Sequence, residues 1–409
     1  MRRNLATLFT GVGLFGMTVL TSVPVQAQNV RATAPVEKDW TLLVYLNGHN
    51  NLDRFGAINI NQMEEVGSTD RLNVVVQWAS QRGGNTKRLL VQKDFKPSQV
   101  TSPIVQDMRR KVDMGDPKSL VDFVRWAHEN YPAKHYMLDI WNHGSGWHRY
   151  QVKNSEGGFQ PMDISWDDNT GHHITTEQLG KSLADIATVI GHKVDIYGSD
   201  ACLMAMAEVA SEMAKSVQVF AGSQEVEPGA GWPYNTFLKR WAAQPDADAA
   251  QVSKFLAEEY LASYSGGENG TQSVTFSSYD LNHLDALNAA VTELGNSLMK
   301  LTPLEKSRAI NAIRDTQNFT YDEYGDFGHF VVNMRKEGLL NAGSQRSIEK
   351  AMDQFVITNQ VSQAYHSATG VSIWLPASAN AYNSYSTRYA GLEFAKATGW
   401  NKALSSLLK

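Results

Sequence analysis

Two short polar segments, each following an apolar run, contain residues that could carry out nucleophilic catalysis. His143 and Gly144 follow the run HYMLDIWN, and Asp200 and Cys202 follow the run VDIYGS. Cys202 is the only cysteine among the 409 residues, so it cannot form a disulfide within the molecule. A thiol and an imidazole are the nucleophile and base of cysteine-type acyl transfer. If the fold brings them together, His143 can deprotonate Cys202 and later protonate the leaving amine.

Both apolar runs, 136–141 and 194–197, are predicted to be strands of one sheet. Other runs of strand length occur at 40–46, 72–78, 88–92, 217–221 and 273–277, and segments with helical periodicity lie between them at 58–66, 120–130, 176–190, 203–216 and 249–263. This alternation indicates an α/β protein with a mostly parallel sheet and helices on both faces. In such sheets the ligand crevice lies at the carboxyl ends of the strands, where His143 and Cys202 are expected.

The predicted helix 203–216 places Cys202 at a helix N-terminus. Free backbone N–H groups and the helix dipole favour a thiolate at that position. Gly144 offers an unobstructed backbone N–H, which together with that of Cys202 could form an oxyanion hole. Two structural alternatives remain open from the sequence: Cys202 as a small buried apolar residue, and Asp200 as a helix N-cap.

The first 27 residues are typical of a cleaved signal peptide, because Arg2 and Arg3 precede an apolar stretch that ends at a small-residue site at 25–27. Removing them changes the formal net charge from -5 to -5 - 2 = -7, which argues against nucleic-acid binding. No later segment is apolar enough for membrane insertion, so we expect an exported protein, either secreted or periplasmic. The remaining divisions are a flexible leader (28–38), an α/β domain (39–280) and a mainly helical C-terminal subdomain with one strand at 371–375 (281–409).

Six blocks of the sequence resemble the clostripain family of cysteine peptidases. They are WTLLVYLNGHNNLD (40–53), NHGSGW (142–147), DACLMAMAEVA (200–210), SQEVEPGAGWPY (223–234), EYGDF (323–327) and TGVSIWLP (369–376). A strand followed by His-Gly and another followed by Asp-Ala-Cys is also similar to caspases, legumains and gingipains. The resemblance implies a caspase-like α/β/α sandwich, a catalytic dyad of His143 and Cys202, and peptide or protein substrates.

The same resemblance implies how the substrate is selected. In the clostripain family the aspartate two residues before the cysteine lies in the S1 pocket and selects Arg or Lys at P1, and here that residue is Asp200. We expect Ser223 and Glu225 of the fourth block to line the same pocket, and Glu225 and Glu227 to add negative potential; plain solvated loop carboxylates are the alternative for these two glutamates. A further pocket acid of a relative has no counterpart at Ala230, so the strength of the Arg/Lys preference is left open.

Relatives of this kind are cut between their histidine and cysteine segments. Residues 147–171 are rich in Gly, Asp, Asn and Ser and predict a long exposed loop, so we expect self-cleavage there, at Lys153 first and Arg149 second. An intact substrate-binding flap is the alternative.

The predicted chemistry requires no cofactor. The adjacent histidines His172 and His173 are weak evidence for zinc. Calcium stays open because some relatives need it, although no Asp-x-Asp-x-Asp-Gly loop is present. A binding protein with a degenerate site and a transpeptidase or amidase of the same fold are the alternative functions, and the sequence does not predict the oligomeric state.

Overall fold

The computed structural model describes residues 35–96, 98–148, 151–153, 159–161 and 163–409, so the predicted signal peptide lies outside the described residues. Pro35–Lys409 form one compact unit built on a nine-stranded sheet with the order β16-β14-β11-β10-β5-β1-β2-β3-β4. The strands are β1 (Lys38–Gly48), β2 (Leu72–Ser80), β3 (Lys87–Leu90), β4 (Ile104–Asp107), β5 (Ala133–Trp141), β10 (Val194–Asp200), β11 (Val217–Gly222), β14 (Thr275–Asp280) and β16 (Val356–Val361). Pairing is parallel from β2 through β1, β5 and β10 to β11, and antiparallel outside these five strands.

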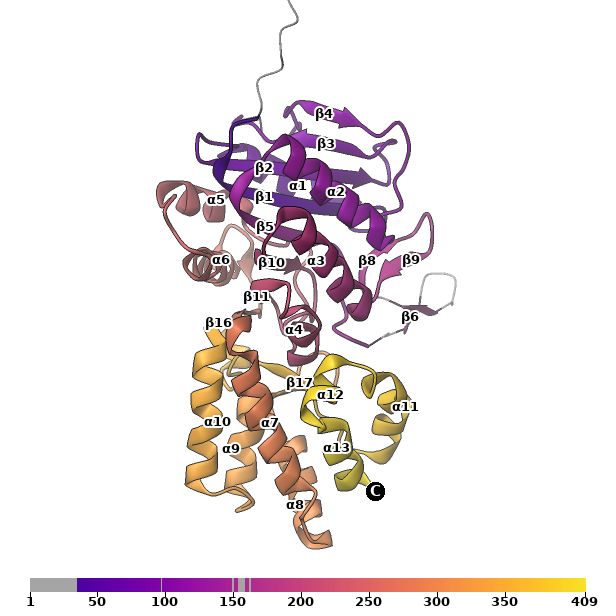
Figure 1. Ribbon diagram of the computed structural model, residues 1–409, viewed down its shortest axis with the longest axis vertical. Coiled ribbons are helices and arrows are strands. Elements are labelled where there is room, and N and C mark those ends of the chain that lie inside the picture. The colour runs from indigo at the N-terminus through magenta and orange to yellow at the C-terminus, as the bar shows by residue number, and fades with distance from the viewer. Residues whose placement is uncertain (1–34, 97, 149–150, 154–158, 162) are drawn as a thin grey trace, which may run out of the picture. The chain divides into compact units, whose positions relative to one another are not determined.

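Helices cover both faces of this sheet (Figure 1). One face carries α1 (Asp53–Glu64), α5 (Tyr234–Ala243) and α6 (Ala249–Tyr264), and the other carries α2 (Pro117–Asn130), α3 (Thr176–Ile190) and α4 (Ala207–Met213). Side chains alternate along a strand, and those of β1 are apolar on both sides of the sheet. Leu42 and Val44 pack on the face covered by α1, α5 and α6, and Leu43 and Tyr45 pack on the face covered by α2, α3 and α4. The prediction of a mostly parallel sheet with helices on both faces is therefore confirmed.

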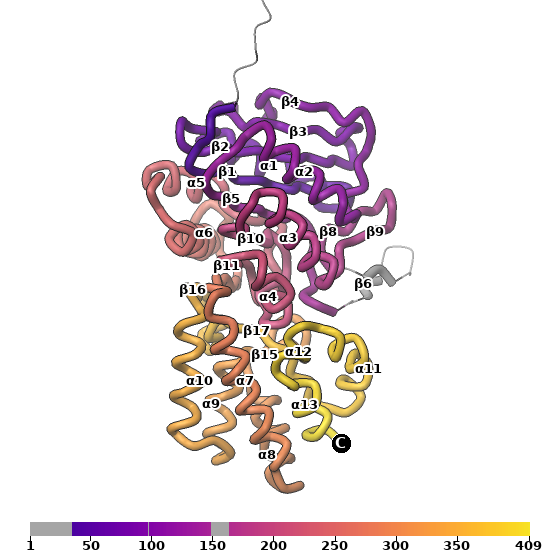
Figure 2. Tube along the Cα trace, viewed as in Figure 1, coloured from indigo at the N-terminus to yellow at the C-terminus, as the bar shows by residue number. Residues whose placement is uncertain are grey.

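The chain after β14 is mainly helical. Its elements are η1 (Leu281–His283), α7 (Leu284–Leu298), α8 (Pro303–Arg314), β15 (Tyr324–Asp326), α9 (Phe327–Lys336), α10 (Ala342–Phe355), η2 (Gln363–Tyr365), β17 (Ser372–Trp374), α11 (Ala379–Tyr389), α12 (Glu393–Thr398) and α13 (Trp400–Leu408). Helix α10 packs against α7 and α9 (Figure 2), and β15 pairs with β17. The division after residue 280 stays a prediction, but β16 returns from this half to pair with β14 in the large sheet.

The segment predicted to be a long exposed loop contains two short hairpins. They are formed by β6 (Gln151–Lys153) with β7 (Phe159–Pro161), and β8 (Ile164–Asp167) with β9 (His172–Ile174). The loop prediction is wrong for residues 163–167, which are buried, because Asp167 pairs with His49 at 2.8 Å and accepts a hydrogen bond from the Met114 N–H at 2.9 Å. A further hairpin joins β12 (Ser265–Gly267) to β13 (Gly270–Thr271). No helix in the described part of the chain is both long and apolar enough to cross a membrane.

Candidate active site

The two residues proposed for catalysis follow neighbouring parallel strands. Trp141 at the end of β5 is the register partner of Asp200 at the end of β10, and β5 and β10 lie side by side in Figure 1. His143 and Cys202 each lie two residues beyond these partners. Both line one cleft of about 310 Å³, together with Asp200, Glu227, residues of the first turn of α1 and glycines of the segment after β11. The structure thus brings the predicted base and nucleophile to the same cleft at the carboxyl ends of the strands.

Glycine at position 144 allows the two segments to approach each other. A Cβ atom built on Gly144 would lie 2.5 Å from the Cys202 carbonyl oxygen and 3.1 Å from the Ala201 Cβ. Contacts this short are not tolerated against backbone atoms, so any other residue would push the His143 segment away from Cys202. The closeness of the two backbones is compatible with an oxyanion hole formed by the N–H groups of Gly144 and Cys202.

His143 is oriented by Asn51, which follows the end of the adjacent strand β1. The His143 Nε2 atom lies 2.6 Å from the Asn51 Oδ1 atom. Because an amide oxygen only accepts, Nε2 carries the proton and Nδ1 carries the lone pair of the neutral ring. Burial lowers the pKa of His143 below its usual value, and the charge of Asp168 opposes this shift. A neutral imidazole whose free nitrogen is Nδ1 is the form required of a general base.

Cys202 does not lie at a helix N-terminus, so that prediction is wrong. It lies in a turn, and α4 begins only at Ala207. The backbone between them is held in a non-helical form because the Leu203 N–H donates to the Glu225 carbonyl at 3.2 Å and the Ala205 N–H donates to the Ser223 carbonyl at 2.9 Å. Tertiary hydrogen bonds here outweigh the helical propensity of an apolar run.

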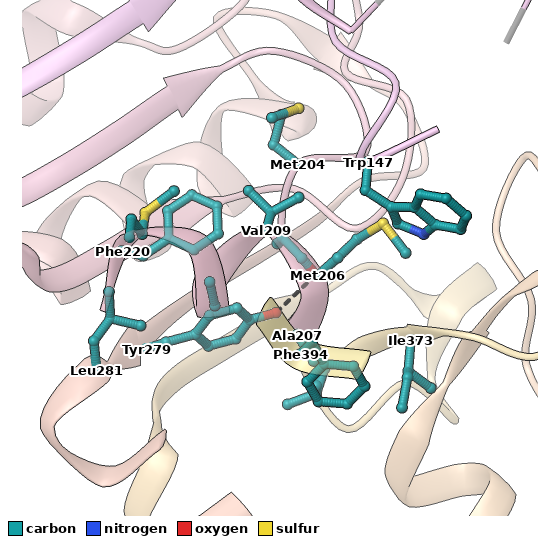
Figure 3. Packing of buried hydrophobic residues seen from close by; sticks show 14 of the residues in the cluster. Trp147, Met204, Met206, Ala207, Val209, Phe220, Tyr279, Leu281, Ile373 and Phe394 are labelled. Carbon is teal, nitrogen blue, oxygen red and sulfur yellow. Dashed lines mark hydrogen bonds between the residues drawn. The ribbon is translucent and has the colours of Figure 1, made fainter. Parts of the chain in front are cut away.

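Side chains from distant parts of the chain bury this non-helical segment (Figure 3). Met204 and Met206 lie among Trp147, Tyr279 and Ile373 in the same apolar cluster. The Tyr279 hydroxyl lies 2.8 Å from the Ala205 carbonyl oxygen and 2.7 Å from the Gly370 carbonyl oxygen, so its single proton is shared between these two acceptors. The segment that follows the nucleophile is therefore fixed from both the sheet and the C-terminal half.

The loss of the helix dipole changes the state expected for the thiol. Burial raises the pKa of Cys202 to about 11, and the charges of Glu225 and Asp200 also raise it. The Glu227 N–H, which donates to Sγ at 3.4 Å, acts in the opposite direction. The raised pKa of Cys202 and the lowered pKa of His143 favour a neutral thiol and a neutral imidazole at neutral pH.

Asp200 belongs to a buried cluster of acids at the side of the cleft. Its Oδ2 atom accepts a hydrogen bond from the Trp232 N–H at 3.3 Å and lies 2.8 Å from the Tyr234 hydroxyl, which is also 2.6 Å from Asp139 Oδ2. A hydroxyl has one proton, so it can donate to only one of the two carboxyls and accepts from the other, which must be protonated. Burial raises the pKa of Asp200 to about 6, and burial and the Asp200 charge raise that of Asp139 well above its ordinary value.

Glu227 completes this acid cluster from the segment after β11. Burial raises its pKa well above the ordinary value, and the neighbouring Asp200 charge adds to the shift. Asp200 and Glu227 both line the cleft, and no Lys or Arg side chain is among the groups that shift their pKa values. A Cβ atom on Gly231 would lie 2.9 Å from the Asp200 carboxylate, so glycine at that position leaves the carboxylate accessible. No ion pair joins a Lys or Arg of the described residues to Asp200 or Glu227, although the exposed Arg54 also lines the cleft, so a cationic group of a ligand can pair with these acids.

The predicted alternative role of Asp200 as a helix cap is wrong. The residue before α4 is Met206, and no side chain caps that helix. Ser223 and Glu225, which were expected in the pocket, are not among the residues that line the cleft. The Ser223 hydroxyl pairs with Thr275 at 3.0 Å, and the Glu225 carboxylate is bound by Tyr365 at 3.0 Å, so both side chains are directed elsewhere.

The predicted cleavage sites cannot be placed at the level of side chains. Lys153 ends strand β6, whose side chains are outside the described residues, and Arg149 lies entirely outside them. Three residues of the site were not singled out from the sequence, namely Asn51, Asp139 and Tyr234. Asp139 carried a signal, because a charged residue inside the apolar run HYMLDIW needs a buried partner. Asn51 could have been found by applying the strand-end rule to the strand 40–46 as well.

Comparison with known proteins supports the family suggested by the sequence motifs. The clostripain family model matches residues 44–406. The chain is 25% identical over 251 residues to clostripain from Hathewaya histolytica, a match that covers 53% of this chain and 45% of that protein. The chain therefore matches less than half the length of that curated relative.

Two solved structures share the fold. A secreted C11 cysteine protease from Bacteroides thetaiotaomicron, in complex with an irreversible peptide inhibitor, superposes with a TM-score of 0.66 at 20% identity, covering 89% of this chain and 99% of that chain. An inactive zymogen C11 protease from Parabacteroides distasonis gives a TM-score of 0.66 at 18% identity over the same shares. The caspase-like α/β/α fold expected from the sequence is confirmed. Because the family model spans the sheet, the cleft and nearly all of the C-terminal helices, this chain belongs to the clostripain family of cysteine peptidases.

Proposed function

We propose that this protein is an exported cysteine endopeptidase that cleaves peptide bonds through a thioester formed on Cys202. The observation that carries the proposal is the single cleft lined by Cys202 and His143 at the ends of two adjacent parallel strands. Membership in the clostripain family supports the same activity. The alternatives are a binding protein with a degenerate site and a transpeptidase or amidase that uses the same pair of residues.

In the proposed reaction His143 Nδ1 takes the thiol proton of Cys202 as its Sγ atom attacks the scissile carbonyl carbon. The backbone N–H groups of Gly144 and Cys202 stabilise the oxygen of the tetrahedral intermediate. The C–N bond then breaks, and the proton on Nδ1 passes to the leaving amine. Water attacks the thioester with His143 again as the base, the C–S bond breaks, and the thiol recovers its proton. Asn51 holds the ring in the tautomer that this sequence of proton transfers needs.

The acid cluster supports a preference for Arg or Lys at P1. Asp200 and Glu227 line the cleft with Cys202, and neither acid forms an ion pair with a described Lys or Arg, although the exposed Arg54 lines the same cleft. A guanidinium or ammonium group of a substrate would supply the missing charge, and Arg can pair with two carboxylates at once. Glu227 takes the place that Glu225 held in the sequence-based proposal. Glu227 can therefore serve as the second pocket acid, for which the sequence offered no counterpart at Ala230.

Export and self-processing are further parts of the proposal. The N-terminal sequence supports export, and secretion is stated for the similar protein from Bacteroides thetaiotaomicron. Processing is supported by the description of the Parabacteroides distasonis relative as an inactive zymogen. Cleavage after Lys153 or Arg149 would fall between the His143 and Cys202 segments.

The decisive experiment is an assay of matched peptides with Arg, Lys, Ala, Asp or Asn at P1, using the wild type and the variants Cys202→Ala and His143→Ala. We expect hydrolysis after Arg and Lys by the wild type only, because each variant removes one half of the nucleophile and base pair. Folding is checked by circular dichroism. Substantial activity of Cys202→Ala would disprove the assignment. Adding an amine acceptor and measuring amide products separates a transpeptidase from a hydrolase, and substrate binding without turnover by the wild type would identify a degenerate binding protein.

A further inference from the structure

The segment after β11, residues 223–231, contacts the Cys202 thiol and also forms one wall of the cleft. Its Glu227 N–H donates to the Cys202 thiol at 3.4 Å, and its Glu225 carbonyl accepts a hydrogen bond from the Leu203 N–H at 3.2 Å. The same segment contributes the Glu227 carboxyl and the exposed Val226 side chain to the lining of the cleft. A displacement of this segment would therefore move the thiol and one wall of the substrate pocket together. We refer to residues 223–231 as the cleft segment.

The Glu225 side chain ties the cleft segment to the C-terminal half. One oxygen of its carboxylate accepts hydrogen bonds from the Thr320 hydroxyl and from the Val226 N–H at 2.7 Å, and the other accepts from the Tyr365 hydroxyl at 3.0 Å. Thr320 precedes β15 and Tyr365 ends η2, so two separate parts of the C-terminal half converge on one carboxylate. Only 6% of Glu225 is exposed, and its described donors are hydroxyls and backbone N–H groups without a basic side chain.

Burial of a carboxylate is costly unless hydrogen bonds satisfy it, and bonds to a charged group are stronger than neutral ones. The two hydroxyls therefore hold Glu225 in place more firmly than two ordinary surface contacts would. The exposed Thr320 side chain and the half-buried Tyr365 ring, which packs near Phe319 with ring centroids 6.2 Å apart, are not part of the cleft lining. Among the described hydrogen bonds, those to Glu225 connect these two hydroxyls to the cleft segment.

We infer that Thr320 and Tyr365 are positioning residues. They hold the Glu225 carboxylate and thereby fix the positions of the Cys202 thiol and the Glu227 carboxyl relative to each other. Through Thr320 and Tyr365 the C-terminal half then influences both kcat and the selectivity at P1. This inference rests on the proposed peptidase function for its catalytic consequence. Its structural consequence, a cleft segment held by two distant hydroxyls, is independent of that function.

The test uses the full chain with Thr320→Val, Tyr365→Phe and the double variant. Thr320→Ser keeps the hydroxyl and is the conservative rescue. Tyr382→Phe is the matched control, because the Tyr382 hydroxyl that it removes donates, among the described hydrogen bonds, only to the Asn401 carbonyl at 3.0 Å. Two quantities are measured: backbone amide exchange of peptides covering the cleft segment, and kcat and KM for P1-Arg and P1-Ala peptides. We expect the double variant to exchange faster in the cleft segment and to lose about tenfold or more in kcat/KM for P1-Arg, mostly in kcat, as for the loss of hydrogen bonds to a charged group.

Selectivity between P1-Arg and P1-Ala should fall together with kcat, whereas Thr320→Ser and Tyr382→Phe should stay within about twofold of the wild type. Unchanged exchange in a folded double variant would overturn the inference. Faster exchange with unchanged kinetics, or an equal loss in Tyr382→Phe, would overturn it as well. If the double variant does not fold, Tyr365→Phe decides by the same measurements, since it keeps the ring. A wild type that cleaves no peptide would defeat the proposed function, and amide exchange alone would then decide whether the two hydroxyls hold the segment.

Discussion

Replacing Asp200 by Asn removes one negative charge from the acid cluster and keeps the shape of the side chain. The Trp232 N–H and the Tyr234 hydroxyl both bond to a single Asp200 oxygen, which an Asn Oδ1 atom can replace. We therefore expect the variant to fold. What it loses is the charge that would face the cation of a P1 Arg or Lys.

The size of the effect follows from the burial of the site. Asp200 is only 5% exposed, so a P1 guanidinium that enters the pocket loses its water and depends on the pocket acids. Leaving one partner of a buried charge pair unmatched costs about 2–5 kcal/mol. Because Glu227 remains as a second acid, we expect the middle of that range, about 3 kcal/mol or roughly 10²-fold in kcat/KM. Glu227→Gln should cost less, since burial and the Asp200 charge favour its protonated form.

The assay compares kcat/KM for peptides that differ only in Arg, Lys or Ala at P1. Asp200→Asn should lower the Arg and Lys values and leave the Ala value near that of the wild type. Asp246→Asn is the control, because its side chain is 86% exposed and pairs only with Arg71 among the described ion pairs. Equal turnover of Arg and Ala peptides by the wild type, or an unchanged Arg-to-Ala ratio in Asp200→Asn, would refute the role of the acid cluster.

Three further outcomes are expected. Asn51→Ala should lower kcat about tenfold by releasing the His143 ring, and Asn51→Asp should raise the pKa of His143 and move the acid limb of the kcat profile to higher pH; an unshifted limb in the Asp variant would contradict this. The pKa of Asp200 is raised to about 6 in the folded state, so between about pH 7 and pH 4 the folded state binds more protons than the unfolded state. The free energy of unfolding should therefore gain a contribution from Asp200 as the pH falls through this range. Asp200→Asn should lose this contribution, as measured by chemical denaturation at several pH values. Mass spectrometry should find cleavage after Lys153 or Arg149 in the wild type and an intact chain in the alanine variant of the nucleophile; equal cutting of both proteins would exclude self-processing.

Local sequence signals were sufficient for helix α3 and for the strand that precedes His143. Helix α3 spans the predicted residues 176–190 because a capping box between Thr175 and Gln178 starts it and Gly191, with φ of 85°, ends it. The end of β5 at Trp141 was also predicted, whereas β10 continues three residues past its predicted end at Tyr197, to Asp200. Each of these features depends on neighbours within a few residues in the chain.

Helix α4 shows where such signals fail. Residues 203–206 are apolar and suited to a helix, yet they remain non-helical because Leu203 and Ala205 bond to the segment after β11, and Met206 forms a β-bridge with Ser372. These partners lie between 18 and 166 residues away in the chain, so no local pattern could reveal them. The same contacts explain why the thiol lacks the stabilising dipole of a helix N-terminus.

The choice between Glu225 and Glu227 as the pocket acid illustrates the same limit at the level of a single site. Both are glutamates of one polar segment, and both are buried, at 6% and 8% exposure. Glu225 is directed away from the cleft because Thr320 and Tyr365 supply hydroxyl donors to its carboxylate, whereas no described hydroxyl donates to Glu227, which interacts with Asp200. The hydrogen-bond donors around Glu225 suit it to anchor the segment, whereas burial and the neighbouring Asp200 charge raise the pKa of Glu227 and favour its protonated form. The direction of the Glu225 carboxylate is therefore decided by side chains that lie 95 and 140 residues further along the chain, beyond the reach of any local pattern.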